Sequence, residues 1–158
     1  MAFDKEDFLS QLMEIFSGST WYGPSIQEIL ISIDIKNVNV KPSGVNHSIA
    51  GLLAHMIAWR TFVIEKMKKN EDFDINPDTN FPDIHIKGIE DWKGLINEFF
   101  NSQEKLLSMI QNIGSDTLIK IVPGRTYSYS HMLQGIIQHD IYHLGQISLI
   151  DKMLENQA

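Results

Sequence analysis

Cysteine is absent from the 158 residues of the chain, and proline occurs only 5 times. The absence of cysteine excludes a disulfide framework, thiolate zinc sites, iron–sulfur clusters and a cysteine nucleophile. Long apolar runs are also lacking, since polar residues interrupt every stretch well before the ~20 residues that a membrane span needs. The sequence therefore predicts a core built without covalent cross-links, in one domain over residues 1–158.

Basic residues are few, because 13 lysines and arginines stand against 20 aspartates and glutamates, which leaves a formal net charge of −7. Phosphate contacts supply most of the non-specific affinity for DNA, so this balance argues against a nucleic-acid partner. The start of the chain, Met1 to Asp7, carries acidic residues where a signal peptide needs basic ones followed by an apolar run. We therefore expect a cytoplasmic protein with no nucleic-acid or membrane partner.

Apolar residues recur at helical spacing over most of the chain. The pattern predicts helices over about residues 4–17, from Trp21–Ser25 to about Ile33 with Pro24 in the first helical position, and over about 46–69, 89–113 and 129–154. Residues 34–46 and 70–87 fit loops, and residues 118–129 fit a short hairpin. Four principal helices, with a long crossover between the second and the third, predict an all-α four-helix bundle.

Six histidines are the unusual feature of a chain that has no cysteine. His139 and His143 are four residues apart, so a helix places their rings on one face, about 40° from each other. The same face carries Ile136 and Ile147, so it should be turned toward the core. In the helix predicted over residues 46–69, His55 likewise lies on the apolar stripe. Three histidines are thus predicted where apolar side chains belong.

Neutral imidazoles that are buried together keep donors and acceptors in need of partners, and each unsatisfied group costs roughly 1–3 kcal/mol. A divalent cation removes this conflict because each ring gives it a lone pair. His55, His139 and His143 would then form a site with one coordination position open for substrate. The alternative is ordinary packing, in which His55 is bonded to the backbone and the other two rings bind nothing.

The other three histidines and Asp140 are not predicted to be metal ligands. We expect His131 near the cap of the last helix, His47 on a different face, and His85 in solvent. Asp140 lies about 100° from His139 around the helix. It fits either an acceptor behind a metal ligand or a surface acid, and we favour the surface acid. The His-Glu-x-x-His arrangement of zinc proteases is absent, so their usual base is absent too.

Three stretches of the sequence resemble the DinB-like superfamily, the DinB and YfiT-type metalloenzymes. They are Trp21 to Ile26, Ser48 to Arg60 with a tryptophan four residues after the histidine, and His139 to Ile147, which reads H-x-x-Y-H-x-G-Q-I. The likeness covers about residues 20–155. It implies a four-helix bundle, often a homodimer, and a divalent metal, zinc or nickel, with His55, His139 and His143 as its ligands.

The resemblance also implies an activity. Some relatives transfer low-molecular-weight thiols such as bacillithiol to electrophiles, others are mycothiol-dependent isomerases, and many have no assigned reaction. Our hypothesis is a metal-dependent enzyme that transfers a thiol to a small electrophilic molecule, with Tyr142, Gln146 or Arg60 as candidates for positioning it. Two alternatives stay open: a hydrolase that uses metal-bound hydroxide, and a non-catalytic dimer whose metal site is structural or vestigial.

Overall fold

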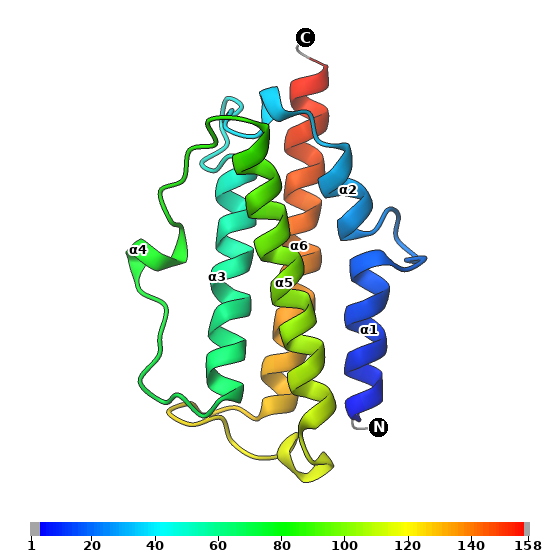
Figure 1. Cartoon of the computed structure of the whole chain (residues 1–158), viewed down its shortest axis with the longest axis vertical. Helices are drawn as coiled ribbons and strands as arrows, with labels where there is room; N and C mark the ends of the chain where they lie inside the picture. Colours follow the sequence, from blue (N-terminus) through cyan, green and yellow to red (C-terminus); the bar gives the residue numbers. More distant parts are fainter. Residues whose placement is uncertain (1–3, 157–158) are drawn as a thin grey trace.

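The computed structural model describes residues 4–156, which fold into a bundle of helices (Figure 1). Four helices are long: α1 (Lys5–Ser17), α3 (Ile49–Met67), α5 (Ile89–Asn112) and α6 (Tyr129–Glu155). Two are shorter, α2 (Ile26–Ser32) and α4 (Pro77–Asn80), and two are 3-10 turns, η1 (Ile35–Asn37) and η2 (Ser115–Thr117). No β-strand occurs in the described part of the chain. The predicted all-α class is confirmed.

Serine side chains define where three of the helices begin. Ser25, Ser48 and Ser128 each accept a hydrogen bond from a backbone N–H in the first turn of α2, α3 and α6. Such a cap satisfies one of the N–H groups that a helix leaves unpaired at its N-terminus. The prediction that Pro24 occupies the first helical position is wrong. The N-cap is Ser25, whose backbone is extended, so the helix begins at Ile26.

The long helices α1, α3, α5 and α6 run side by side along the long axis of the molecule (Figure 1). Helix α3 packs against both α5 and α6, and α1 packs against the same two helices from another side. The core between them consists of fully buried side chains that include Phe8, Leu12, Leu53, Met56, Phe99, Leu106, Leu133 and Ile147. Helix α6 is therefore covered on more than one side. No helix among residues 4–156 is long and apolar enough to cross a membrane.

Residues 68–88 lead the chain back along the bundle from the end of α3 to the start of α5 (Figure 1). The sequence predicts a loop without helical period over residues 70–87, and the structure has one helical turn there, α4. The turn forms because Asn76 accepts hydrogen bonds from the N–H groups of Asp78 and Thr79, with Pro77 in the first turn. Helix α4 lies against α3. The crossover thus brings residues 80 and 81 beside the middle of α3.

The hairpin expected over residues 118–129 is reduced to one isolated bridge between Ile121 and Ser128. The N–H of Val122 donates to the carbonyl of Tyr127 at 3.0 Å, and Gly124 between them has a φ of +70°. Glycine is suited to this position because it adopts a positive φ without a steric penalty. The connection is a tight turn that delivers the chain directly to the cap of α6.

Candidate metal centre

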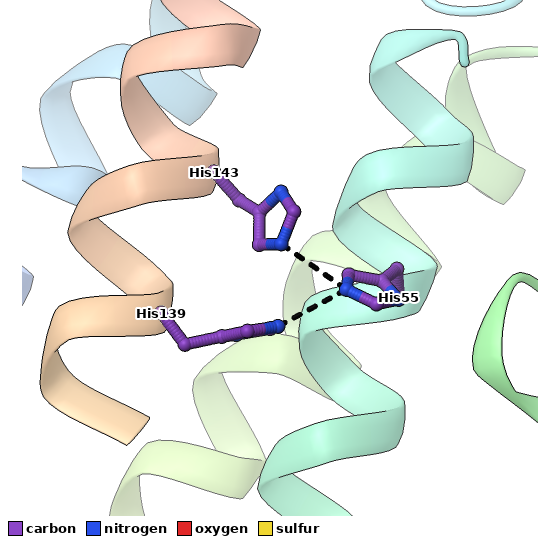
Figure 2. Close-up of side chains that lie close together, drawn as sticks. All are labelled: His55, His139 and His143. Carbon is purple, nitrogen blue, oxygen red and sulfur yellow. Dashed lines mark hydrogen bonds between the residues drawn. The ribbon is translucent and has the colours of Figure 1, made fainter. Parts of the chain in front are cut away.

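Three histidines from two facing helices point their rings at one place (Figure 2). His55 comes from the middle of α3, and His139 and His143 come from successive turns of α6. The Nε2 atom of His55 lies 3.1 Å from Nε2 of His143 and 3.0 Å from Nε2 of His139. Among the histidine, aspartate and glutamate side chains of residues 4–156, these three histidines form the group that is close enough together to hold a metal ion.

The Nδ1 atoms of two of these rings already have acceptors. His55 Nδ1 lies 2.5 Å from the backbone carbonyl of Asn80, and His143 Nδ1 lies 2.6 Å from Oε1 of Gln146. Because a carbonyl oxygen can only accept, each Nδ1 carries the proton and each Nε2 carries a lone pair. In the neutral state neither Nε2 has a proton to donate across the 3.1 Å between them. Two lone pairs therefore face each other in a buried place.

The third ring does not resolve this conflict. A proton on His139 Nε2 would satisfy one of the two neighbouring lone pairs and leave the other without a partner. The Nδ1 atom of His139 is buried and has no hydrogen-bond partner. Oδ1 of Asp140 lies 3.9 Å from it, which is too far for a hydrogen bond, and this oxygen is also buried without a partner. The site is short of positive charge at its centre.

A divalent cation matches what the three rings lack. Tetrahedral bonds of about 2.0–2.1 Å from zinc to imidazole nitrogen place the nitrogens roughly 3.3 Å apart, close to the observed 3.0 and 3.1 Å. An all-imidazole donor set suits zinc, nickel and copper rather than magnesium or calcium, which prefer oxygen ligands. The residues present could thus hold such an ion, with His55, His139 and His143 each offering one nitrogen.

Burial favours the neutral form of the His55 and His143 rings, which is the form that could bind a metal. Desolvation, aided by the neighbouring imidazoles and opposed by the Asn80 carbonyl, lowers the pKa of His55 from 6.5 to about 4. Burial also lowers the pKa of His143 below its usual value, against the hydrogen bond to Gln146. Since a protonated imidazole has no lone pair to offer, a depressed pKa keeps these nitrogens available as ligands near neutral pH.

The crossover holds His55 from the side away from α6. The Phe81 ring stacks on the His55 ring with 3.9 Å between their centroids. Phe81 also stacks on the His47 ring, again with 3.9 Å between centroids. Nε1 of Trp59 donates to the side-chain oxygen of Asn80 at 2.9 Å. His47 is therefore outside the group of three, as expected, but it contacts that group through Phe81. Asn80 and Phe81 were not predicted, because a loop offers no periodic signal.

Asp140 is fully buried, so the interpretation of it as a surface acid is wrong. Its Oδ2 accepts a hydrogen bond from Nε of Arg60 at 2.9 Å and lies 2.7 Å from Nη2. Arg60 is fully buried as well and donates to Oε1 of Gln103 at 2.8 Å, and Gln103 donates to the carbonyl of Leu12 at 2.8 Å. This cluster joins all four long helices, and Arg60 is committed to it rather than available to position a substrate.

The other candidate residues lie around the three histidines. Gln146 is the hydrogen-bond partner of His143, and Tyr142 is exposed with its ring edge against the His143 ring, 4.9 Å between centroids. His85 is exposed in the crossover, as expected. His131 is also exposed, and its N–H donates to the capping hydroxyl of Ser128 at 3.2 Å, so its predicted place near the cap is confirmed.

A cleft of about 220 Å³ between α3 and α6 ends at His139. Its walls are mostly apolar and are formed by Trp59, Phe62, Val63, Tyr127, His131, Met132, Gly135, Ile136 and His139. A second cleft of about 290 Å³ lies on the Gln146 side and is lined by residues that include His47, Leu149 and Met153. The group of three histidines is thus reached from open space on the His139 side.

The sequence model of the DinB superfamily matches residues 26–147, which is more than half of the chain and includes His55, His139 and His143. The chain belongs to the DinB superfamily. The resemblance carried by the residues around His55 and by the segment His139 to Ile147 is thereby confirmed. No curated protein and no solved structure matches the chain. The family assignment of this DinB-superfamily protein states no reaction, so the activity stays a prediction.

Proposed function

We propose that this DinB-superfamily protein is a metal-dependent enzyme that transfers a low-molecular-weight thiol, such as bacillithiol, to a small electrophilic substrate. The supporting observation is the convergence of three Nε2 atoms. Two of them carry lone pairs because the Nδ1–H on the other side of the ring donates to an oxygen acceptor. A zinc or nickel ion bound there supplies the charge that lowers the pKa of a coordinated thiol. Because the chain has no cysteine, the thiol has to come from a second molecule.

The residues of the chain have distinct tasks in this proposal. His55 and His143 are held in fixed orientation by the Asn80 carbonyl and by Gln146, so their geometry is set before any ligand binds. His139 borders the cleft, so substrate approaches from its side. In the transfer, the thiol sulfur bonds to the electrophilic carbon, the leaving group departs with the electron pair of the broken bond, and the thiol proton passes to solvent.

The composition of the clefts favours thiol transfer over hydrolysis. Neither the cleft at His139 nor the cleft at Gln146 is lined by an aspartate or glutamate among the described residues. Hydrolysis by a metal centre gains from a carboxylate that accepts a proton from water, whereas a thiol is acidic enough to be ionised by the metal alone. The partial exposure of His139 also argues against a purely structural ion, which would be enclosed by four protein ligands.

Self-association is the second part of the proposal. Tyr142 and Leu149 are exposed large side chains seven residues apart on α6, so they lie on one face of that helix. We propose that this face contributes to a homodimer. Light scattering should give twice the chain mass for the wild type and the single-chain mass for Leu149→Asp. A wild type that stays monomeric at high concentration would contradict the dimer and leave the metal site untouched.

Metal analysis of the purified protein tests the site. The wild type should hold about one zinc or nickel ion per chain, and His143→Ala should bind it at least 100-fold more weakly because one nitrogen ligand is lost. His85→Ala is the matched control, since His85 is an exposed histidine outside the group. Equal metal content in wild type and His143→Ala would refute the site.

The reaction is tested with 1-chloro-2,4-dinitrobenzene as the electrophile and a panel of thiols that includes bacillithiol. We expect chloride release and thioether formation that require both metal and thiol and that disappear in His143→Ala. Hydrolysis of a nitrophenyl ester without any thiol would instead favour the hydrolase alternative. A metal-containing protein that is inert with every thiol and with the ester would favour a non-catalytic bundle.

A further inference from the structure

The cleft between α3 and α6 has mostly apolar walls and lies beside the three histidines. Its walls come from two aromatic residues of α3, Trp59 and Phe62, and from an apolar stretch of α6 that includes Met132 and Ile136. The cleft borders the proposed metal site because His139, one of the three histidines, lines it. The rings of Tyr127 and His131, which also line it, lie 5.5 Å apart between centroids. The space is therefore a mostly apolar cleft that is partly open to solvent and has a candidate ligand, His139, in its wall.

We propose that this cleft binds a phenyl-sized apolar group of the substrate, and so selects aromatic or similarly bulky apolar molecules. A cavity of about 150 Å³ lined by apolar side chains is large enough for benzene. The observed volume of about 220 Å³ therefore accommodates a ring with a short substituent. The link to a reacting substrate rests on the proposed function, whereas the apolar binding site itself does not.

The exposure of the three histidine rings indicates on which side of the proposed metal site the apolar group of a substrate would lie. The His139 side chain is 21% exposed, whereas His55 and His143 are buried residues. On the crossover side, the Phe81 ring covers His55 at 3.9 Å. A molecule with one atom near the three Nε2 atoms can therefore extend past His139, and the space it meets there is the apolar cleft.

Gly135 gives direct experimental access to the cleft. It lies one turn before His139 on α6, lines the cleft, and has no atom within 4 Å of the position where a Cβ would be. A larger side chain at this position would enter the cleft without a clash against the backbone. Gly94 of α5 also has open space at its Cβ position, is exposed, and is remote from the cleft. It provides a matched control in a helix interior.

The first test measures toluene binding to the metal-free protein by NMR titration, using the methyl signals of Val63, Met132 and Ile136. We expect saturable binding in the wild type, at least threefold weaker binding in Gly135→Ala, and at least tenfold weaker binding in Gly135→Leu. Gly94→Leu should bind toluene as the wild type does. Alanine and leucine are better helix formers than glycine, so thermal unfolding should show all three variants folded.

Two outcomes of that titration would overturn the proposal. One is a wild type whose methyl signals do not shift with toluene, and the other is a Gly135→Leu variant that binds toluene as tightly as Gly94→Leu does. A third outcome concerns a different occupant. If light scattering shows a dimeric wild type and a monomeric Gly135→Leu, a second copy of the chain fills the cleft and the substrate proposal is wrong.

The second test uses the cobalt-substituted protein and two thiols, benzyl mercaptan and 2-mercaptoethanol, followed by the cobalt absorption bands. The wild type should bind benzyl mercaptan at least tenfold more tightly, and this preference should vanish in Gly135→Leu but persist in Gly94→Leu. Absence of metal binding with toluene binding intact would refute the proposed function alone. Metal and thiol binding without any preference for the aromatic thiol would refute the apolar subsite alone.

Discussion

Two groups of buried polar side chains lie next to each other along α3 and α6, and their polar atoms are partnered in different ways. Arg60 follows His55 by five residues, and Asp140 directly follows His139. Arg60 and Asp140 neutralise each other within the chain and are held by further hydrogen bonds. The three histidines turn the Nε2 atoms of neutral rings toward one point, where a cation could bind. The first group is neutralised within the chain, whereas the second could be completed by a bound ion.

This difference separates a group that stabilises the fold from a group that could hold an ion. A buried ion pair contributes when both partners are present, and the loss of one partner leaves a charge in an apolar place. Neutral rings carry no charge that the loss of a neighbour would leave unpaired, so we expect the protein to fold with or without an ion between them. The two groups should therefore respond in opposite ways to mutation and to pH.

The largest expected effect is on the ion pair. Arg60→Met should lower the free energy of unfolding by about 3–5 kcal/mol, because Asp140 would keep a buried charge without a counter-charge. Urea denaturation of the metal-free protein measures this loss. The double variant Arg60→Met/Asp140→Leu is the control and should recover most of the stability, since no charge is left behind. A loss below about 1 kcal/mol in the single variant would contradict the structural assignment of this pair.

The next largest effect is the pH dependence of stability that the His55 ring causes. The pKa of His55 is about 4 in the folded chain against 6.5 ordinarily, so between these values the unfolded chain binds more protons than the folded chain. Stability from this source is therefore complete above pH 6.5 and decreases by about 1–3 kcal/mol as the pH falls toward 4. Urea midpoints of the metal-free protein at pH 7 and pH 4.5 measure it.

The control for that experiment is His55→Leu, which retains every carboxylate that also titrates in this range. Its midpoint should fall less between pH 7 and pH 4.5 than the midpoint of the wild type. Identical decreases in both proteins would show that the buried His55 ring does not resist protonation.

A smaller effect is expected at the aromatic ring that covers the site. Phe81→Ala should weaken zinc binding by about tenfold, because residues behind a metal ligand fix its orientation. Competition with a chromophoric chelator measures the affinity. Phe73→Ala is the matched control, since Phe73 is a partly buried phenylalanine in the same crossover and lines a different pocket. Equal weakening by both substitutions would indicate a general loosening of the crossover instead of a specific contact with His55.

The smallest expected change in stability is that of a histidine variant, and it contrasts with the large change expected for Arg60→Met. His139→Leu should change the stability of the metal-free protein by less than about 1 kcal/mol, since an apolar side chain of similar volume removes a ring with an unpaired Nδ1. The same substitution should abolish measurable zinc binding at micromolar concentration. Denaturation and metal titration of one preparation check both. A destabilisation as large as that of Arg60→Met would show that the histidines are needed for folding itself.

The long helices and the three histidines were predictable from the sequence because both depend on local spacing. The ranges predicted from the apolar spacing, about 46–69, 89–113 and 129–154, agree with α3, α5 and α6. A polar residue on an apolar stripe is a conflict that the sequence alone shows. His55, His139 and His143 were found through that conflict. The same reasoning misplaced Asp140, since it assumed that α6 buries one face only. Helix α6 contacts α1, α2 and α3, so a residue 100° away from His139 is buried too.

The structure of the crossover could not be predicted from the spacing of apolar residues. Residues 70–87 have no period, and the places of Asn80 and Phe81 depend on contacts with α3 that are distant along the chain. The fully buried Lys66 is a similar case, since its ammonium group donates to the carbonyls of Asn70 and Glu71 at the start of that crossover. A lysine in a helical pattern gives no sign that it will be buried.

The hydrogen-bond acceptor for His55 is the backbone carbonyl of Asn80, and every amino acid has that carbonyl. A substitution at position 80 therefore removes the partner of Trp59 but leaves the partner of His55 in place. A deletion or insertion between α3 and residue 80 has the opposite effect, because it moves the carbonyl while every side chain is kept. Among homologous chains, this segment should thus be free to diverge in amino-acid identity while its length is held constant.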